Sequence, residues 1–553
     1  MRGVFLNEFT MTGAQKRALT LFCAIIIGFS ALFLRIFLVS TGDELQAVAK
    51  NQSSYTLTLD QSRGMIYDCM FKPLVGNTDG YVLSVLPSDE AAAALVKAVP
   101  FAERENVLKL IESGRPFLYP YTSPYIDAQG ISVFTVKKRY GVNQLASHVI
   151  GHLDGEGVGV YGIERAYDAL LADNSGKMTV TYAVDALRRP IANSSPEISR
   201  ENYHNREGVV LTIDAEMQQI AEEEGARLIE KGAVVVMEAA TGKLRAVASF
   251  PSFDPANVAA SLNDPNSPLI NRCYSAYNVG STFKLCGVSA ALEAGVATDF
   301  TYTCTGSTEV NGLRYYCHNR AGHGELNLDQ AMQHSCNPYF INLALETGYD
   351  KLYEMAVRFG FGKANNLTEV TRTAAGTLPT MQSLRNNAVL ANFSFGQGEL
   401  TATPIQIARM IAVFANGGTL VTPTLVEGIS DETGTAIAAP NAPAGSYRML
   451  SSTNADIVRQ LMVNVVNTGS GKQAKPVEDG AGGKTGSAQT GIYDEQGNEI
   501  VHAWFSGFFP AEEPKYVIVV LNEGKDSGGD WSAPVFREIA DRIHNLEKRR
   551  AQQ

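Results

Sequence analysis

Residues 280 to 287 read GSTFKLCG, which places a serine hydroxyl and a lysine amine three positions apart. The chain continues mostly apolar from Val288 to Leu292, so the pattern predicts a helix that begins near Ser281. On one helical face the Cβ atoms of Ser281 and Lys284 would lie about 5–6 Å apart. A buried lysine with a lowered pKa can take the proton of a serine and make it a nucleophile. The spacing alone is weak evidence, because about two such pairs occur by chance in a chain this long.

Two further motifs follow this pair along the chain. Ser335-Cys336-Asn337 lies in the stretch HSCNPYF, in a region rich in predicted helix. Lys484-Thr485-Gly486 begins a predicted strand that reads KTGSAQT. S-x-x-K, S-x-N and K-T-G therefore occur in this order, each on the local structure that would present its side chains together.

Strand-like segments on both sides of the motifs predict one antiparallel sheet. Five runs alternate or are rich in β-branched and aromatic residues, namely AVVVM (233–237), LRAVAS (244–249), KTGSAQT (484–490), WFSGFFP (504–510) and KYVIVVLNEG (515–524). Asp214 is placed to cap a helix before the first run, and Ser532 a helix after the last. We expect an α+β fold: a five-stranded antiparallel sheet with these two helices on one face and the helix-rich middle on the other.

The N-terminal region predicts a membrane anchor. Residues 18–39 read ALTLFCAIIIGFSALFLRIFLV, with Arg35 as the single charge, and 22 residues of helix span a bilayer core of about 30 Å. Lys16 and Arg17 precede this run, and Asp43 and Glu44 follow it, so the positive-inside rule predicts a cytoplasmic tail over 1–17 and an exterior remainder. The apolar run exceeds that of a cleaved signal peptide, which favours an uncleaved anchor at the cytoplasmic membrane.

The 553 residues allow several domains, and a net charge of −11 argues against a general nucleic-acid binder. Residues 40–205 mix short strand-like runs with polar loops and contain no nucleophile, base and anion site in one neighbourhood. We expect a mixed α/β, non-catalytic pedestal there and the catalytic domain over 206–553. His148 and His152, four residues apart, are expected to be structural.

The cysteines number seven, and the absence of a C-x-x-C pair argues against a structural zinc site, so we expect no metal and no cofactor. Cys304 and Cys317 flank an Asn311-Gly312 turn signal, outside the membrane, where thiols oxidise. We predict that they form a disulfide; two separate, reduced cysteines are the alternative. Cys336 is not the expected partner, because Ser335 and Asn337 must face the site and turn Cys336 into the domain.

The three motifs together resemble the penicillin-binding proteins and serine β-lactamases. The closer resemblance is to class B penicillin-binding proteins, the monofunctional peptidoglycan D,D-transpeptidases, and it extends over nearly the whole chain. It rests on the single anchor, RGMIYD (63–68), GVYGIERAYD (159–168), VVLTIDAEMQQIA (209–221), VVVMEAATGKLRAVASFPSFDP (234–255) and FSFGQGELTATPIQIA (393–408). No glycosyltransferase domain precedes these segments, which favours class B over class A. Val279 departs from the family's common proline, and Ser487 from its common threonine.

The resemblance implies a role for each motif residue. Ser281 would attack the carbonyl between two D-alanines of a stem peptide, and Lys284 would take its proton. Ser335 would relay a proton to the leaving D-alanine, and Asn337 would orient Lys284 and bind the substrate backbone. Lys484, Thr485, Gly486 and Ser487 would bind the substrate or a β-lactam, and the backbone N–H groups of Ser281 and Ser487 would form the oxyanion hole.

Several functions fit this pattern. The expected one is a transpeptidase that cross-links stem peptides on peptidoglycan strands, is inhibited by β-lactams, and works with a SEDS-type membrane glycosyltransferase. A D,D-carboxypeptidase or β-lactamase on the same fold is an alternative, since the residues do not separate an amine from water as the acyl acceptor. A non-catalytic β-lactam sensor or scaffold is disfavoured by the short tail and by the intact motifs.

Overall fold

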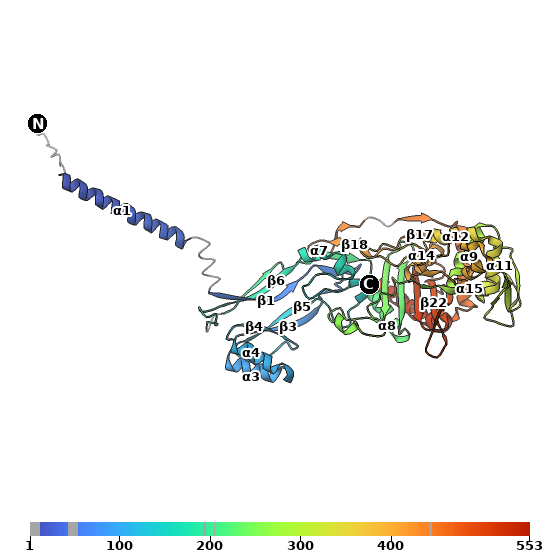
Figure 1. Cartoon of the computed structure of the whole chain (residues 1–553), viewed down its shortest axis with the longest axis horizontal. Coiled ribbons are helices and arrows are strands. Elements are labelled where there is room, and N and C mark those ends of the chain that lie inside the picture. The colour runs from blue at the N-terminus through green and yellow to red at the C-terminus, as the bar shows by residue number, and fades with distance from the viewer. Residues whose placement is uncertain (1–11, 42–52, 192–194, 204, 442–444) are drawn as a thin grey trace, which may run out of the picture. The chain divides into compact units, whose positions relative to one another are not determined.

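The structure is a computed structural model that describes residues 12–41, 53–191, 195–203, 205–441 and 445–553 (Figure 1). The chain divides into two compact units. The first unit comprises 1–61, 79–137 and 176–203, and the second unit comprises 62–78, 138–175 and 204–553.

Helix α1 (Gly13–Ser40) contains the whole of the expected anchor, 18–39. Thr12 caps it, accepting a hydrogen bond from the backbone of Gln15. Its most apolar window has a mean hydropathy of 2.5, and among the described residues it is the one helix long and apolar enough to cross a membrane. This agrees with a single-pass anchor.

Beyond α1, the described part of the first unit contains two small sheets and two α-helices. One sheet has the strand order β1-β6-β7 and the other β4-β3-β5. Their bounds are β1 Ser54–Ser62, β3 Thr78–Val85, β4 Phe117–Tyr121, β5 Ile131–Lys138, β6 Gly176–Ala183 and β7 Glu197–Glu201. Helices α3 (Asp89–Ala98) and α4 (Arg104–Glu112) pack on the second sheet through a small core that includes Leu83, Leu95 and Val107.

A five-stranded antiparallel sheet forms the centre of the second unit, in the order β10-β9-β23-β22-β21. Its strands are β9 Gly232–Glu238, β10 Leu244–Phe250, β21 Gly482–Tyr493, β22 Glu499–Phe509 and β23 Tyr516–Glu523. The pairing joins the first hairpin, green in Figure 1, to the C-terminal strands, coloured red. All five strands lie where the sequence predicts them.

Alternating side chains of these strands enter two separate cores. Val234 and Val236 pack with α8 (Ala215–Leu228) and α16 (Ala533–Ala551) on one face. Val235 points to the opposite face, which α14 (Pro404–Ala415) covers. The period of two residues along a strand explains this division. The expected layers, with the first and last helices on one face and the helical middle on the other, are confirmed.

The helical middle also carries the S-x-x-K and S-x-N motifs and several short strand pairs, whereas K-T-G lies on β21. Its other helices are α9 Lys284–Glu293, α10 Leu328–Gln333, α11 Asn337–Thr347, α12 Tyr349–Phe359, α13 Asn387–Ser394 and α15 Ser452–Asn467. The strand pairs are β11 Tyr277–Asn278 with β16 Thr401–Ala402, β12 Tyr302–Cys304 with β15 Gly324–Leu326, β13 Ser307–Val310 with β14 Leu313–Tyr316, and β17 Thr419–Val421 with β20 Ser446–Arg448.

The expected boundary at residue 205 is not a single cut. Strand β2 (Met65–Tyr67) pairs in parallel with β8 (Gly208–Leu211), in a sheet completed by β18 (Val426–Ser430) and β19 (Ile437–Pro440). The short helices α5 (Ser147–Ile150), α6 (Gly162–Ala166) and α7 (Asp168–Asp173) also belong to the second unit. Two stretches of the expected pedestal, 62–78 and 138–175, therefore pack with the catalytic part.

A buried ion-pair network holds these two stretches together. Glu164 is fully buried and accepts hydrogen bonds from the guanidinium groups of Arg63, at 3.0 Å, and Arg139, at 2.7 Å. His148 lies nearby in the sequence with its Nε2 2.6 Å from the carbonyl oxygen of Pro268, and burial lowers the pKa of this histidine to about 4. These contacts support the structural interpretation of His148.

Candidate active site

Ser281 lies in a 3₁₀ turn, η3 (Gly280–Phe283), immediately before helix α9. The α-helix therefore begins at Lys284, three residues later than the spacing predicts. Gly280 has a φ of +61°, and a Cβ on it would lie 2.9 Å from the carbonyl oxygen of Ser487. Glycine thus lets strand β21 approach the turn that carries Ser281. The N–H of Gly280 donates to the carbonyl of Gly396, which fixes the other side of this turn.

Lys284 is fully buried, and its ammonium group is directed at the S-x-N motif. Its Nζ donates to Oδ1 of Asn337 at 2.6 Å, to the carbonyl oxygen of Ser335 at 2.8 Å and to Oγ of Ser335 at 3.2 Å. Its Nζ also lies 5.2 Å from the ring centroid of Phe340. Burial lowers the pKa of Lys284 to about 7. A substantial share of this amine is therefore neutral near pH 7, as a base requires.

A second buried lysine reaches the same hydroxyl from the sheet. Lys484 on β21 is fully buried, and its Nζ donates to Oγ of Ser335 at 2.8 Å and to the carbonyl oxygen of Thr485 at 3.0 Å. Burial, and then the charge of Lys284, hold the pKa of Lys484 well below its ordinary value. The Ser335 hydroxyl thus links two amines, one from each wall of the site. Ser335 adopts a φ of +50°, a left-handed conformation that is uncommon for serine.

Strand β21 is the edge of the central sheet on the side of the Ser281 turn. An edge strand presents backbone N–H and C=O groups that a peptide can pair with. Gly486 keeps this edge close to the turn, because a Cβ there would lie 2.8 Å from Oγ1 of Thr282. Thr485 is held by a hydrogen bond of 2.8 Å between its Oγ1 and Oγ of Ser470. Ser487 is exposed at the same edge.

A cavity of about 750 Å³ opens over these residues. Ser281, Ser335, Asn337, Thr485 and Ser487 all line it. The predicted site residues, drawn from three motifs that span about 200 positions of sequence, thus meet at one cleft. A cleft that holds the Ser281 hydroxyl and, next to it, a Ser335 hydroxyl bonded to two amines of lowered pKa is suited to nucleophilic attack on a carbonyl and proton transfer to the leaving group.

The sequence of the second unit matches the family model described as the penicillin-binding protein transpeptidase domain, over residues 232–541. The chain belongs to the penicillin-binding protein transpeptidase family. The match begins with strand β9 and ends within α16, so it contains the whole central sheet and all three motifs. It also lies inside the expected catalytic domain, 206–553.

Relatives extend the similarity to most of the chain. Stage V sporulation protein D of Bacillus subtilis is 29% identical over 535 residues, which cover 90% of this chain and 80% of that protein. Peptidoglycan D,D-transpeptidase MrdA of Haemophilus influenzae is 26% identical over 623 residues, covering 96% and 93%. The ceftriaxone acyl-enzyme structure of penicillin-binding protein A from Mycobacterium tuberculosis is similar with a TM-score of 0.55 and 30% identity, covering 60% of this chain and 79% of that one. The resemblance to class B penicillin-binding proteins is confirmed.

Several residues of this transpeptidase cleft are not predicted from the sequence. Ser470, which positions Thr485, lies in a turn after α15 that only its Gly469 and Gly471 neighbours mark. His318 and His334 also line the cavity, although sequence spacing gives no reason to place them there. Three-dimensional packing alone brings these side chains to the site.

The predicted disulfide does not form: Cys304 and Cys317 are both free cysteines. Cys336 is fully buried, as expected, yet its sulfur lies 4.0 Å from that of Cys317. Cys336 forms no disulfide either, in agreement with the expectation that it is not the partner. The turn that directs Ser335 and Asn337 to the cleft directs Cys336 at Cys317 instead.

Proposed function

We propose that this chain is a membrane-anchored, serine-type peptidoglycan D,D-transpeptidase with Ser281 as its nucleophile. The observation that carries the proposal is the Ser335 hydroxyl, which is bonded to two fully buried lysines beside the Ser281 turn. Buried amines of lowered pKa are costly to maintain, and they are typical of catalytic acid–base sites.

In the proposed acylation step, Oγ of Ser281 attacks the carbonyl carbon between two D-alanines and its proton passes to Nζ of Lys284. The backbone N–H groups of Ser281 and Ser487 stabilise the oxyanion, each donor contributing about 3–4 kcal/mol. The peptide C–N bond then breaks, and a proton reaches the leaving D-alanine nitrogen through the Ser335 hydroxyl. The product is an ester between Ser281 and the shortened stem peptide.

The remaining motif residues bind the donor peptide in this proposal. Asn337 holds Lys284 and donates to the substrate backbone. Lys484 provides a positive potential, and Thr485 binds the terminal carboxylate. The substrate lies along the edge of β21 at Gly486 and Ser487, where an extended peptide adds a strand to the sheet. No step requires a metal or an organic cofactor.

An amine of a neighbouring stem peptide completes the reaction by attacking the ester. This produces a peptide bond between two glycan strands and frees Ser281. A D,D-carboxypeptidase or β-lactamase would use water at the same step. The relative MrdA carries the name peptidoglycan D,D-transpeptidase, and the relative from Mycobacterium tuberculosis was solved as a ceftriaxone acyl-enzyme; both support the transpeptidase and the acylation by β-lactams.

We infer the orientation of the anchor from charge. Arg2, Lys16 and Arg17 lie on one side of the apolar run, which places the N-terminus in the cytoplasm and the residues that follow the run outside it. The acyl donor and acceptor are polymers on that outer side. A SEDS-type glycosyltransferase in the same membrane is the partner that would supply uncross-linked strands.

The decisive experiment compares reaction products. The purified full chain is added to uncross-linked peptidoglycan strands, and the strands are digested with a muramidase and separated by mass spectrometry. We expect cross-linked dimers with wild type, and none with Ser281→Ala or after addition of penicillin. Ser452→Ala, a change at an exposed serine of α15, is the matched control and should leave the dimers unchanged.

Two other outcomes would contradict the proposal. Stem peptides that are shortened by one D-alanine and never cross-linked would identify a carboxypeptidase. An unaltered substrate, together with no penicillin adduct on Ser281, would identify a scaffold.

A further inference from the structure

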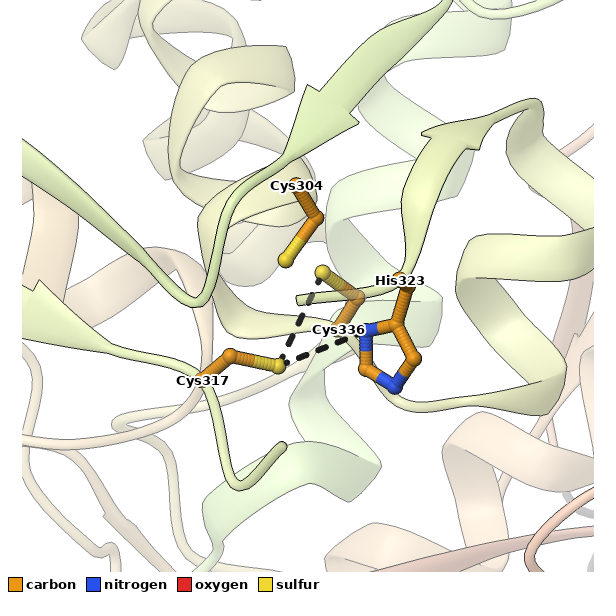
Figure 2. Close-up of side chains that lie close together, drawn as sticks. All are labelled: Cys304, Cys317, His323 and Cys336. Carbon is orange, nitrogen blue, oxygen red and sulfur yellow. Dashed lines mark hydrogen bonds between the residues drawn. The ribbon is translucent and has the colours of Figure 1, made fainter. Parts of the chain in front are cut away.

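Four metal-binding side chains converge beside the S-x-N motif: Cys304, Cys317, His323 and Cys336. One ligand atom from each lies within 4.8 Å of every other (Figure 2). We call them the cysteine–histidine cluster. None of these side chains has a role in the proposed reaction. A disulfide would join only two of the three buried cysteines and leave the third thiol without a function.

The backbone brings the four residues together. Cys304 ends β12 and pairs across the sheet with Gly324, and the N–H of His323 donates to the carbonyl oxygen of Cys304 at 3.0 Å. Cys317 follows β14, and its N–H donates to the carbonyl oxygen of Gly306 at 3.0 Å. Cys336 is the N-cap residue of α11. The cluster therefore joins a two-strand pair and a hairpin to the first turn of a helix.

Glycine is required at the two bends that make this convergence possible. Gly306 and Gly322 have φ values of +92° and +85°. A Cβ on Gly306 would lie 2.0 Å from the carbonyl oxygen of Arg320, and one on Gly322 would lie 2.3 Å from that of Cys304. The loops are thus built for close approach of their backbones at the cluster.

The distances within the cluster fit a shared metal ion better than a disulfide. The sulfur of Cys317 lies 4.0 Å from that of Cys336 and 3.5 Å from Nδ1 of His323. A disulfide needs a sulfur–sulfur distance of about 2.05 Å. Tetrahedral zinc, with bonds of about 2.3 Å to sulfur and about 2.0 Å to nitrogen, sets sulfur–sulfur and sulfur–nitrogen distances of about 3.8 and about 3.5 Å.

The donor set identifies the metal. Three thiols and one imidazole form a soft set that selects zinc over magnesium or calcium. The sulfurs belong to cysteines that are at most 2% exposed, and four protein ligands fill a tetrahedral coordination sphere. A closed sphere of this kind is structural, because it leaves no position for water or substrate.

We propose that the cysteine–histidine cluster binds one Zn²⁺ ion that holds the Ser335–Asn337 turn in its catalytic conformation. Cys336 lies between the two motif residues, so a bond from its sulfur to the metal fixes the backbone on both sides. That backbone carries Ser335 in its left-handed conformation, with its hydroxyl 2.8 Å from Nζ of Lys484. The four ligands are positioning residues and contact no reacting atom. The metal site itself goes beyond the proposed function, whereas the effect of the metal on acylation rests on the proposed function.

Metal content tests the site directly. The full chain is purified in detergent under reducing conditions, exchanged into zinc-free buffer and measured by inductively coupled plasma mass spectrometry. We expect about one zinc per wild-type chain and a loss of most of it in Cys317→Ala and His323→Ala. Cys69→Ala removes a partly buried cysteine outside the cluster and should keep the zinc.

A second measurement uses wild type alone, so that an unfolded variant cannot decide the result. After removal of zinc with a chelator, we expect a lower thermal unfolding midpoint and penicillin acylation slower by about 10–100-fold, both restored by Zn²⁺ and not by Mg²⁺. Addition of Co²⁺ should produce the visible absorption of a tetrahedral cobalt–thiolate site.

The proposal is overturned if folded wild type holds no more zinc than Cys317→Ala, or if Co²⁺ gives no thiolate absorption. A disulfide between any two cluster cysteines in freshly purified protein would also overturn it. Because zinc content and cobalt absorption do not depend on turnover, a failure of the proposed function would be recognised separately.

Discussion

At the scale of single residues, Lys284 combines complete burial with hydrogen bonds to both residues of the S-x-N motif. Burial removes water from the ammonium and favours its neutral form. In the proposed mechanism, the Ser281 hydroxyl, three residues earlier in the chain, gives its proton to this amine. The proposed mechanism therefore rests more on the state of this amine than on any other single group.

Replacement of Lys284 by alanine should slow acylation of Ser281 by penicillin by about 10²–10⁴-fold, the usual contribution of a general base. Stopped-flow or mass-spectrometric acylation rates, with circular dichroism as a check of folding, measure this. Lys472→Ala removes an exposed lysine that also lines the cavity and should keep the rate. A Lys284→Ala rate within about threefold of wild type would exclude Lys284 as the base.

The acylation rate should rise with pH, with a midpoint near the pKa of about 7 that burial gives Lys284. The sign follows because the neutral amine is the base, and protonation below this pKa removes it. Lys484 also faces Ser335, and burial together with the charge of Lys284 holds the pKa of Lys484 well below its ordinary value. A rate that is constant between about pH 5 and about pH 9 would contradict this assignment.

At the scale of elements, the 3₁₀ turn η3 and the edge strand β21 must approach closely to form the proposed oxyanion hole. Gly280 and Gly486 allow this approach, since a Cβ on either would lie under 3 Å from an atom of the facing segment. The turn η3, which carries Ser281, contacts strand β21, which carries Lys484-Thr485-Gly486. Small displacements at this contact are expected to affect catalysis before stability.

Gly280→Ala should therefore slow acylation strongly while costing about 1–3 kcal/mol of stability. Gly295→Ala is the matched control, because Gly295 has a similar φ of +73° but open space around its Cβ position. Both variants carry the backbone strain, and only the first pushes against β21. Equal acylation rates in the two variants, measured at matched folded fractions, would refute this role of Gly280.

The sequence predicts the strands well and the turns poorly. Strand β9 can be predicted without an alternation of apolar and polar residues, because AVVVM (233–237) is a short apolar run bounded by polar or glycine residues. The continuous run is explained by the structure, in which the side chains of β9 are buried on both faces of the sheet. The sequence places the start of α9 three residues too early, because a 3₁₀ turn has nearly the same side-chain spacing as a first helical turn.

The cysteine–histidine cluster shows where prediction from sequence ends. Its members are separated by 12, 5 and 12 residues, and no C-x-x-C pair announces them. Their meeting depends on the pairing of β12 with β15 and on the position of α11, which are long-range features. The turn predicted at Asn311-Gly312 is confirmed, since it joins β13 to β14 in a hairpin, yet the disulfide predicted across it does not form.

At the scale of the whole molecule, the catalytic unit is assembled from three separate parts of the chain. Composition does not reveal this, because 62–78 and 138–175 have the same mixture of short strand-like runs and polar loops as the rest of the expected pedestal. Buried ion pairs of Glu164 with Arg63 and Arg139 connect these two parts. Glu164 is the carboxylate that both arginines share, and Arg63 also pairs with Asp168 at 2.6 Å.

Glu164→Gln should lower the stability of the second unit by about 3–5 kcal/mol, since it leaves two buried guanidinium groups without this carboxylate. Thermal unfolding followed by circular dichroism measures this as a lower midpoint. Glu105→Gln, which alters an exposed ion pair with Lys109, is the control and should change the midpoint little. An unchanged midpoint in Glu164→Gln would show that the network does not stabilise the unit.

The central claim is that Ser281 forms the acyl-enzyme, and intact-mass spectrometry of the full chain after incubation with penicillin tests it most directly. The account predicts one penicilloyl adduct per wild-type chain, located on the peptide that contains Ser281, and no adduct in Ser281→Ala. An adduct that persists in folded Ser281→Ala, or that maps to another residue, would contradict it.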